Sequence, residues 1–184
     1  LYNQINTKKI WRFVMKLGVF TVLLSATGLE ESLSYLKKSG VQAVELGAGG
    51  YPGKAHVNPE LLLSDEGEIK KLKELIKKYD MDISALSCHG NPVHPQKEIA
   101  QSFHEDFEKA VLLAEKLGVD RIVGFSGCPG DSPNSMYPNW VTCPWPEDFL
   151  KILDYQWNEV LIPYWERTSK FAIPGFRCII QNHY

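Results

Sequence analysis

Strand-like and helix-like segments alternate along this chain, and that alternation limits the folds it can adopt. Four short apolar runs rich in Val, Ile and Leu predict strands at residues 16–24, 41–47, 81–87 and 120–127. Apolar residues spaced three and four apart predict a helix after each strand, at about 29–39, 68–79, 103–117 and 146–172. Four βα units in series predict a parallel sheet with helices outside it, joined by right-handed crossovers.

Two closures of such a sheet fit the pattern: a doubly wound open sheet and part of a (β/α)8 barrel. No G-x-G-x-x-G follows the first strand, which removes the best support for a dinucleotide-binding open sheet. The long polar loops follow the strands, whereas the connections after the helices are short. Barrel enzymes carry their chemistry on the loops that follow the strands. We therefore predict the barrel.

Local signals predict where elements begin and break. Thr27 and Glu30 have the T-x-x-E spacing of a capping box, which predicts that Thr27 caps the first helix, and Gly40 ends it. Pro163 lies inside the last predicted helix, and because proline lacks the backbone N–H we expect a kink or a division there. The strand at 16–24 shows no polar alternation, so we expect it to be buried on both faces.

The length of the chain supports only part of a barrel. A complete barrel takes about 250 residues, whereas this chain has 184, and we assign residues 15–172 as the N-terminal half, with about four βα units. Residues 1–14 have no barrel pattern, and we interpret them as upstream sequence translated ahead of a native start at Met15. We interpret residues 173–184 as an atypical tail left by truncation or frameshift, although FRCII within it has some strand character.

Composition limits the classes of partner. The formal net charge of −2 argues against nucleic acid, because phosphate binding needs a basic face. No apolar run reaches the ~18–20 residues of a membrane span, so we expect no membrane partner, although a secretion signal over 8–28 is an alternative interpretation of the first strand. The 4 cysteines have no CxxC spacing, which predicts reduced thiols and a cytoplasmic location.

The main candidate site residues lie where predicted strands end, which in a barrel is the mouth of the active site. His89 ends the third strand within ALSCHGNPVHP, and it fits a pocket residue, a metal ligand or a side chain bonded to the turn that contains Asn91. His94 lies beyond that turn and is the weaker metal candidate. Glu45 lies in the apolar second strand, where a buried carboxylate needs either a polar site or an ion pair.

The loops supply further candidates. His56 lies in the glycine-rich loop after the second strand, whose N–H groups could bind an anion. Ser126 and Cys128 follow the fourth strand and could line a pocket, although nothing near Cys128 predicts the lowered pKa of a nucleophile. Trp140 and Trp145 lie in the long fourth loop, where their rings could stack on a sugar face or pack over the barrel.

Four motifs together carry a resemblance to a known family. MKLGVFTVLL, VELGAGGYPGKAH, ISALSCHGNPVHP and FSGCPGDSPNSMYPNWVTCPWPEDF resemble a bacterial group of sugar phosphate isomerase/epimerase proteins in the xylose isomerase-like TIM-barrel superfamily. The resemblance runs from Met15 to about Ala172. It implies an eight-stranded barrel that binds a divalent metal ion (Mn, Mg, Zn or Co) and moves protons on a sugar or sugar phosphate. The metal polarises oxygens while a carboxylate takes the proton.

The same resemblance implies that the family's metal ligands (two Glu, one Asp and one His) lie from the fifth strand onward. No ligand of that set is therefore assigned here, only a minor metal role is kept for His89, and catalytic residues stay unassigned. This chain alone is expected to be inactive. The alternatives are a non-catalytic half-barrel that binds a partner or forms a homo-oligomer, and a metal-dependent endonuclease of the same superfamily. The predicted substrate-binding residues are Glu45, His56, His89, Asn91, Ser126 and Trp140.

Overall fold

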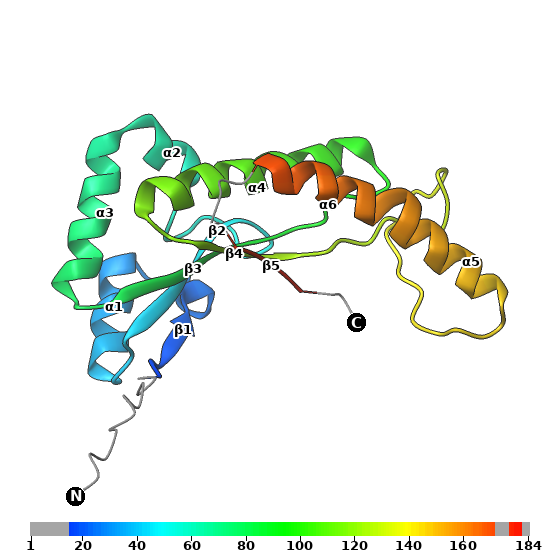
Figure 1. The fold of residues 1–184 in the computed structure, drawn as a ribbon. Coiled ribbons are helices and arrows are strands. Elements are labelled where there is room, and N and C mark those ends of the chain that lie inside the picture. The colour runs from blue at the N-terminus through cyan, green and yellow to red at the C-terminus, as the bar shows by residue number, and fades with distance from the viewer. Residues whose placement is uncertain (1–14, 172–176, 182–184) are drawn as a thin grey trace, which may run out of the picture.

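The computed structural model describes residues 15–171 and 177–181, so the predicted leader 1–14 lies outside the described residues, as do 172–176 and 182–184. Parallel strands alternate with helices along the chain (Figure 1). The strands are β1 (Gly18–Phe20), β2 (Ala43–Gly50), β3 (Asp82–His89), β4 (Arg121–Phe125) and β5 (Arg177–Gln181). The helical elements are η1 (Thr21–Leu24), α1 (Leu29–Lys38), α2 (Pro59–Ser64), α3 (Glu66–Lys78), α4 (Lys97–Leu117), α5 (Asp148–Asp154), η2 (Tyr155–Leu161), α6 (Ile162–Thr168) and η3 (Ser169–Phe171).

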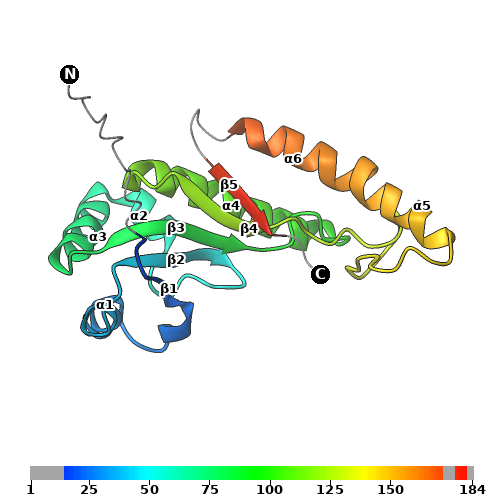
Figure 2. The same cartoon turned by 60° about the horizontal axis from the view of Figure 1, so that its bottom comes forward.

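The strands lie in the sheet in the order β1-β2-β3-β4-β5, and every neighbouring pair is parallel. A doubly wound sheet would reverse its strand order at a switch point, whereas a barrel adds each strand beside the previous one. The prediction of a partial (β/α) barrel is therefore confirmed. Figure 2 shows the strands side by side, with α4 packed along the sheet.

Alternate strand residues face the helices and form the core. Val44, Leu46, Leu86 and Ile122 are fully buried against apolar side chains of α1, α3 and α4. Each such burial contributes about 1.5–3 kcal/mol, so packing on the helix-facing side of the sheet stabilises the fold. Because side chains alternate along a strand, the intervening residues point to the opposite face. We call five of them the inner wall: Phe20, Glu45, Ser87, His89 and Phe125.

The predicted first strand is only partly correct. β1 ends at Phe20, and residues 21–24 form the single 3₁₀ turn η1 instead of continuing the strand. Within the described residues β1 pairs only with β2, so nothing on its other side extends or covers it. Leu23 is accordingly 81% exposed, and the expectation of burial on both faces is wrong here.

The capping-box prediction at Thr27 is also wrong. Helix α1 begins at Leu29 with Gly28 at the N-cap, and no side chain caps it. The Thr27 hydroxyl instead donates to the Leu24 carbonyl oxygen at 2.9 Å, which closes the turn after η1. Glu30 forms an ion pair with Lys78 at 2.6 Å, so neither residue is available for the reciprocal cap.

Helix α2 was missed by periodicity because it is only six residues long. Its start nevertheless carries a recognisable signal: the Asn58 side chain accepts a hydrogen bond from Glu60 N at 3.0 Å, and Pro59 occupies the first turn. Asparagine at the N-cap followed by proline is a standard helix start. The loop expected over this region is therefore interrupted by a helix.

α5, η2 and α6 form one helical arm: α6 lies beside α4, and the α5 end projects beyond the end of the sheet (Figure 1). The division expected near Pro163 appears as a change of helix type, because η2 is π-helical and α6 starts with proline in its first turn. The wider π turn accommodates the missing N–H of proline and the bulk of its ring. The predicted single helix is thus one arm with two hydrogen-bonding patterns.

The strand character of FRCII is realised in β5, which pairs in parallel with β4 from Arg121↔Arg177 to Phe125↔Gln181. β5 occupies the position next in order after β4, as the barrel topology requires. None of the described helices combines the length and apolar character needed to cross a lipid bilayer.

Candidate functional site on the inner wall

The inner wall draws side chains from four neighbouring strands to the carboxyl ends of the sheet. Phe20 pairs with Glu45 across β1 and β2, and Ser87 and His89 follow on β3. The Phe20 and His89 ring centroids lie 6.0 Å apart, and those of His89 and Phe125 lie 4.5 Å apart. A barrel exposes this end of its strands to substrate. The wall is therefore a mixed surface of aromatic rings, one carboxylate and one imidazole.

Glu45 occupies a polar site and not an ion pair. Its side chain is half-buried, and its Oε1 accepts a hydrogen bond from the Ser87 hydroxyl, which is fully buried. Among the described residues no Lys, Arg or His forms a salt bridge with Glu45. A carboxylate has about four acceptor positions, so most of its capacity is open to hydroxyl groups of a ligand.

His89 is held at the end of β3 between aromatic rings and is only 8% exposed. Its carbonyl oxygen accepts a hydrogen bond from Tyr51 N at 2.6 Å, which ties the strand end to the loop after β2. β3 ends at His89, where the sequence places it, and a pocket role for His89 stays a prediction. The His94 side chain bonds within its own loop, where its Nδ1 accepts a hydrogen bond from Gln96 N at 3.0 Å.

The described residues do not fit a metal centre. Within 15–171 and 177–181, no group of three or more His, Cys, Asp or Glu side chains is placed to hold a metal ion. Structural and catalytic sites for transition metals use at least three protein ligands. The described residues therefore do not add support to the metal role considered for His89, and that role stays a prediction.

Asn91 joins the loops that follow β3 and β4. The side chain is buried, its Oδ1 accepts from Cys128 N at 2.9 Å, and its Nδ2 donates to the Cys128 carbonyl oxygen at 2.9 Å. Through these two bonds the Asn91 side chain pairs with the backbone of Cys128 as the backbone of a neighbouring strand would. A substrate contact by Asn91 stays a prediction, while the structural role is directly visible.

Ser126 and Cys128 follow β4 as predicted. Ser126 is buried, and its carbonyl oxygen accepts a hydrogen bond from Trp165 Nε1 at 2.9 Å, which anchors α6 to the end of β4. Cys128 and Cys143 are free thiols. Burial raises the pKa of the Cys128 thiol, so little of it is thiolate at neutral pH. This agrees with the expectation that Cys128 is not a nucleophile.

His56 contacts the start of α1. Its Nε2 donates to the Thr27 carbonyl oxygen at 3.0 Å and lies 3.5 Å from Ser32 Oγ. These contacts hold the β2–α2 loop to α1 and make no link to Glu45 or His89. The structure therefore does not bring His56 together with the two main candidates, and its substrate contact stays a prediction.

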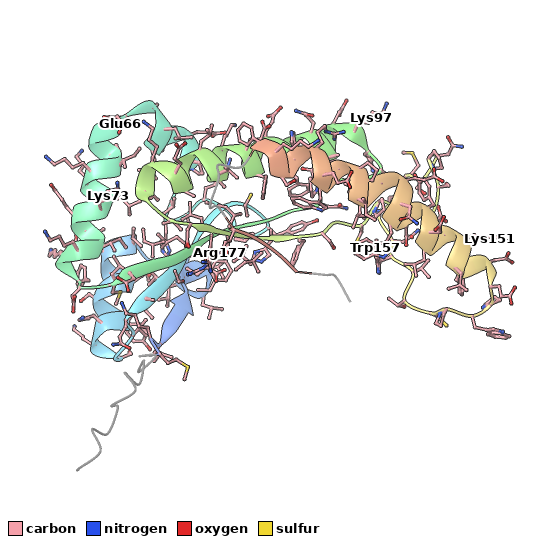
Figure 3. All side chains as sticks on the ribbon, in the orientation of Figure 1. Glu66, Lys73, Lys97, Lys151, Trp157 and Arg177 are labelled. Carbon is pink, nitrogen blue, oxygen red and sulfur yellow. The ribbon has the colours of Figure 1, made fainter. Side chains whose placement is uncertain are left out.

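The two tryptophans of the fourth loop behave differently. Trp140 is half-buried and packs edge-on against Trp157 of η2, with centroids 5.3 Å apart. Trp145 is 76% exposed, so packing over the barrel does not apply to it. Figure 3 shows Trp157 nearer the sheet and Lys151 toward the outer part of the arm. Trp140 thus belongs to the arm, and its stacking on a sugar stays a prediction.

Sequence reasoning missed the aromatic members of the wall. Phe20 and Phe125 were counted only as strand residues, and Ser87 was not singled out. Period-two spacing could have found Ser87, because it lies two residues before His89 on the same face of β3. The rings needed the pairing register, which a single sequence does not contain.

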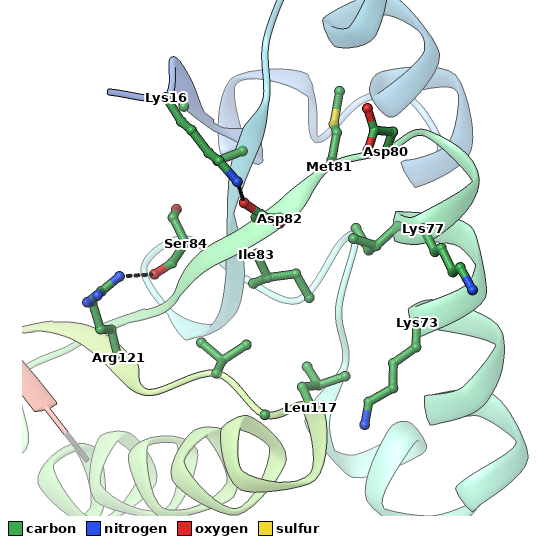
Figure 4. A pocket seen from close by; sticks show the side chains of 15 residues that line it. Lys16, Lys73, Lys77, Asp80, Met81, Asp82, Ile83, Ser84, Leu117 and Arg121 are labelled. Atoms are coloured by element: carbon green, nitrogen blue, oxygen red, sulfur yellow. Dashed lines mark hydrogen bonds and ion pairs between the residues drawn. The ribbon is translucent and has the colours of Figure 1, made fainter. Parts of the chain in front are cut away.

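A large hollow lies at the other end of the sheet. It has a volume of about 710 Å³ and is lined by Lys16, Lys73, Lys77 and Arg121 among others (Figure 4). Lys16 is paired there with Asp82. This end holds the short loops that lead into the strands, whereas barrel chemistry occurs where the strands end. We therefore place the candidate site on the inner wall.

Comparison with known proteins agrees with the barrel-like strand order. Residues 33–162 match the family described as xylose isomerase-like TIM barrel. The chain belongs to this xylose isomerase-like family. An uncharacterized protein of Bacillus subtilis (strain 168), YfiH, is 35% identical over 160 residues, which cover 86% of this chain and 51% of YfiH.

Two solved structures have a similar fold. The IolI protein, solved with a bound zinc atom, has a TM-score of 0.56 and 17% identity, over 91% of this chain and 51% of IolI. A D-allulose 3-epimerase from Methylomonas sp. has a TM-score of 0.50 and 13% identity, over 90% of this chain and 51% of the epimerase. The chain thus spans about half the length of these relatives.

Proposed function

We propose that this chain is part of a sugar isomerase or epimerase and that its inner wall binds the sugar or sugar phosphate. The observation that carries the proposal is Glu45, which is bonded only to the Ser87 hydroxyl among the described residues. It lies on the same face of the sheet as His89 and the two phenylalanine rings that contact His89. Membership of the xylose isomerase-like family and the epimerase among its structural relatives support it. The activity of the whole protein is part of this proposal.

The chemistry of the wall suits a sugar. Sugars carry hydroxyl groups at their edges and C–H groups on their faces, and the wall offers acceptors and rings for both. Carboxylate–hydroxyl hydrogen bonds are charge-assisted and roughly twice as strong as neutral ones. Glu45 is also the group able to accept a proton from a carbon next to a carbonyl, the step that isomerases and epimerases share.

We assign no step to a metal ion. The zinc atom in the IolI structure makes a divalent metal ion the expected cofactor of complete proteins with this fold. The described residues of this chain do not gather a ligand set for it. The homo-oligomeric half-barrel and the endonuclease stay predictions, because no specific contact among the described residues favours either over the sugar enzyme.

Glu45→Gln tests the proposal without changing the shape of the wall. The amide keeps one oxygen acceptor but loses the charge, so we expect it to bind D-fructose and D-fructose 6-phosphate at least 5–10-fold more weakly, about 1–1.4 kcal/mol. Saturation-transfer NMR titration of the full chain measures both affinities.

Glu31→Gln is the control, because Glu31 is an exposed acid on α1. This control should bind both sugars as the wild type does. Equal affinity of Glu45→Gln and wild type for both sugars, or no binding by the wild type, would contradict the proposed function.

A further inference from the structure

The turn that follows β2 lies directly against the end of β3. Gly47 pairs with Ser87 and Gly50 pairs with His89, so β2 has one more residue than β3 between these two pairs. The extra residue is a β-bulge, a feature that often re-aims chain beside active sites. Gly50 has φ +65, and a Cβ atom there would lie 2.0 Å from the His89 carbonyl oxygen. Only glycine allows this approach.

The Tyr51 ring connects the turn to the inner wall. Its ring centroid lies 5.1 Å from that of Phe103 on α4 and 6.4 Å from that of Phe125. Phe125 in turn packs against the His89 imidazole. The position of the turn therefore affects His89 twice, through its carbonyl oxygen and through the rings beside its side chain.

One carboxylate on α4 holds both ends of this turn. Asp106 Oδ2 accepts a hydrogen bond from Gly50 N at 2.9 Å, and Asp106 Oδ1 forms an ion pair with Lys54 Nζ at 2.7 Å. The Asp106 and Lys54 side chains are only 18% and 27% exposed. The hydrogen bond to Asp106 raises the pKa of Lys54, so Lys54 stays charged throughout the physiological range. Glu60 of α2 adds a weaker contact to Lys54 at 3.6 Å.

We propose that Asp106 is a positioning residue of the inner wall. By fixing the Gly50–Lys54 turn against the end of β3, it sets the placement of Tyr51 and His89 without touching the ligand. The structural part stands on the contacts above, and the consequence for binding rests on the proposed function.

Asp106→Asn separates the two bonds that the carboxylate makes. An amide has one oxygen, so it accepts from either Gly50 N or Lys54 Nζ and turns an N–H group toward the other donor. We expect changed ¹H–¹³C resonances of the His89 and Tyr51 rings, with the fold retained. We also expect 5–10-fold weaker binding of D-fructose. Lys54→Arg keeps the ion pair and should behave as wild type on all three readouts.

Glu66→Gln is the matched control, since it removes the exposed ion pair with Lys116 on the outside of the helices. It should leave the His89 and Tyr51 resonances and the affinity unchanged. Unchanged His89 and Tyr51 resonances in Asp106→Asn overturn the positioning role, and so do unchanged affinities in a wild type that binds D-fructose. If the wild type binds no sugar but Asp106→Asn still shifts both rings, the positioning role stands and the proposed function fails.

Discussion

Gly50→Ala is expected to destabilise the protein by about 3 kcal/mol or more, among the largest effects of a single methyl group. An L-residue at φ +65 costs about 1–2 kcal/mol for the left-handed conformation alone, and the new Cβ would meet the His89 carbonyl oxygen at 2.0 Å. The backbone must therefore move, which separates the turn from the end of β3. Urea unfolding followed by circular dichroism measures the change.

Gly40→Ala is the control for this substitution. Gly40 has a similar φ of +80, but no atom lies within 4 Å of the added Cβ. Gly40→Ala should lower the free energy of unfolding by only about 1 kcal/mol, which is the conformational cost without the clash. Equal losses at Gly40 and Gly50 would show that the approach of the turn to β3 is not tight, and would contradict the placement of the wall described above.

Asn91→Ala is expected to cost about 2–4 kcal/mol, because the N–H and the carbonyl oxygen of the half-buried Cys128 both lose their partner. The residue is 3% exposed and makes both bonds at 2.9 Å. Its removal uncouples the loops after β3 and β4, so hydrogen exchange at Cys128 N should rise together with the loss of stability.

Asn158→Ala provides the comparison for Asn91→Ala. Asn158 lies on the exposed face of the arm and donates only to Asp154 Oδ1 at 2.7 Å. Asn158→Ala should lower the free energy of unfolding by no more than about 0.5 kcal/mol, as for surface positions generally. A loss at Asn91 as small as that at Asn158 would mean that water replaces the Cys128 bonds, and the loop connection would then not be structural.

The sequence predicted the parallel sheet and the strand ends at which we propose the site, because both follow from hydrophobic patterning and loop lengths. The sequence also placed His89 at the end of the third strand, where β3 ends in the structure. The prediction of the first strand is wrong over residues 21–24, because strand propensity alone cannot show that β1 has one neighbour among the described strands. Propensity yields to such tertiary context routinely.

A candidate site residue could be predicted from the sequence only where its own type and position in a strand were sufficient evidence. Glu45 stood out as a carboxylate in an apolar strand, but its partner Ser87 depends on the register between β2 and β3. Asp106 lies 56 positions from Gly50 in the sequence and looked like any acidic residue of an amphipathic helix. Contacts of this kind arise from packing, which local patterns do not encode.

The most direct test of the central claim is where a sugar binds. Aromatic and methyl ¹H–¹³C spectra of the full chain are recorded during titration with D-fructose 6-phosphate. The aromatic region reports on Phe20, His89 and Phe125 together. We expect these three rings to shift in parallel with a single dissociation constant. Shifts confined to Trp140 and Trp145, or to methyl groups around the lysine-lined hollow of Figure 4, would contradict the assignment of the inner wall as the binding site.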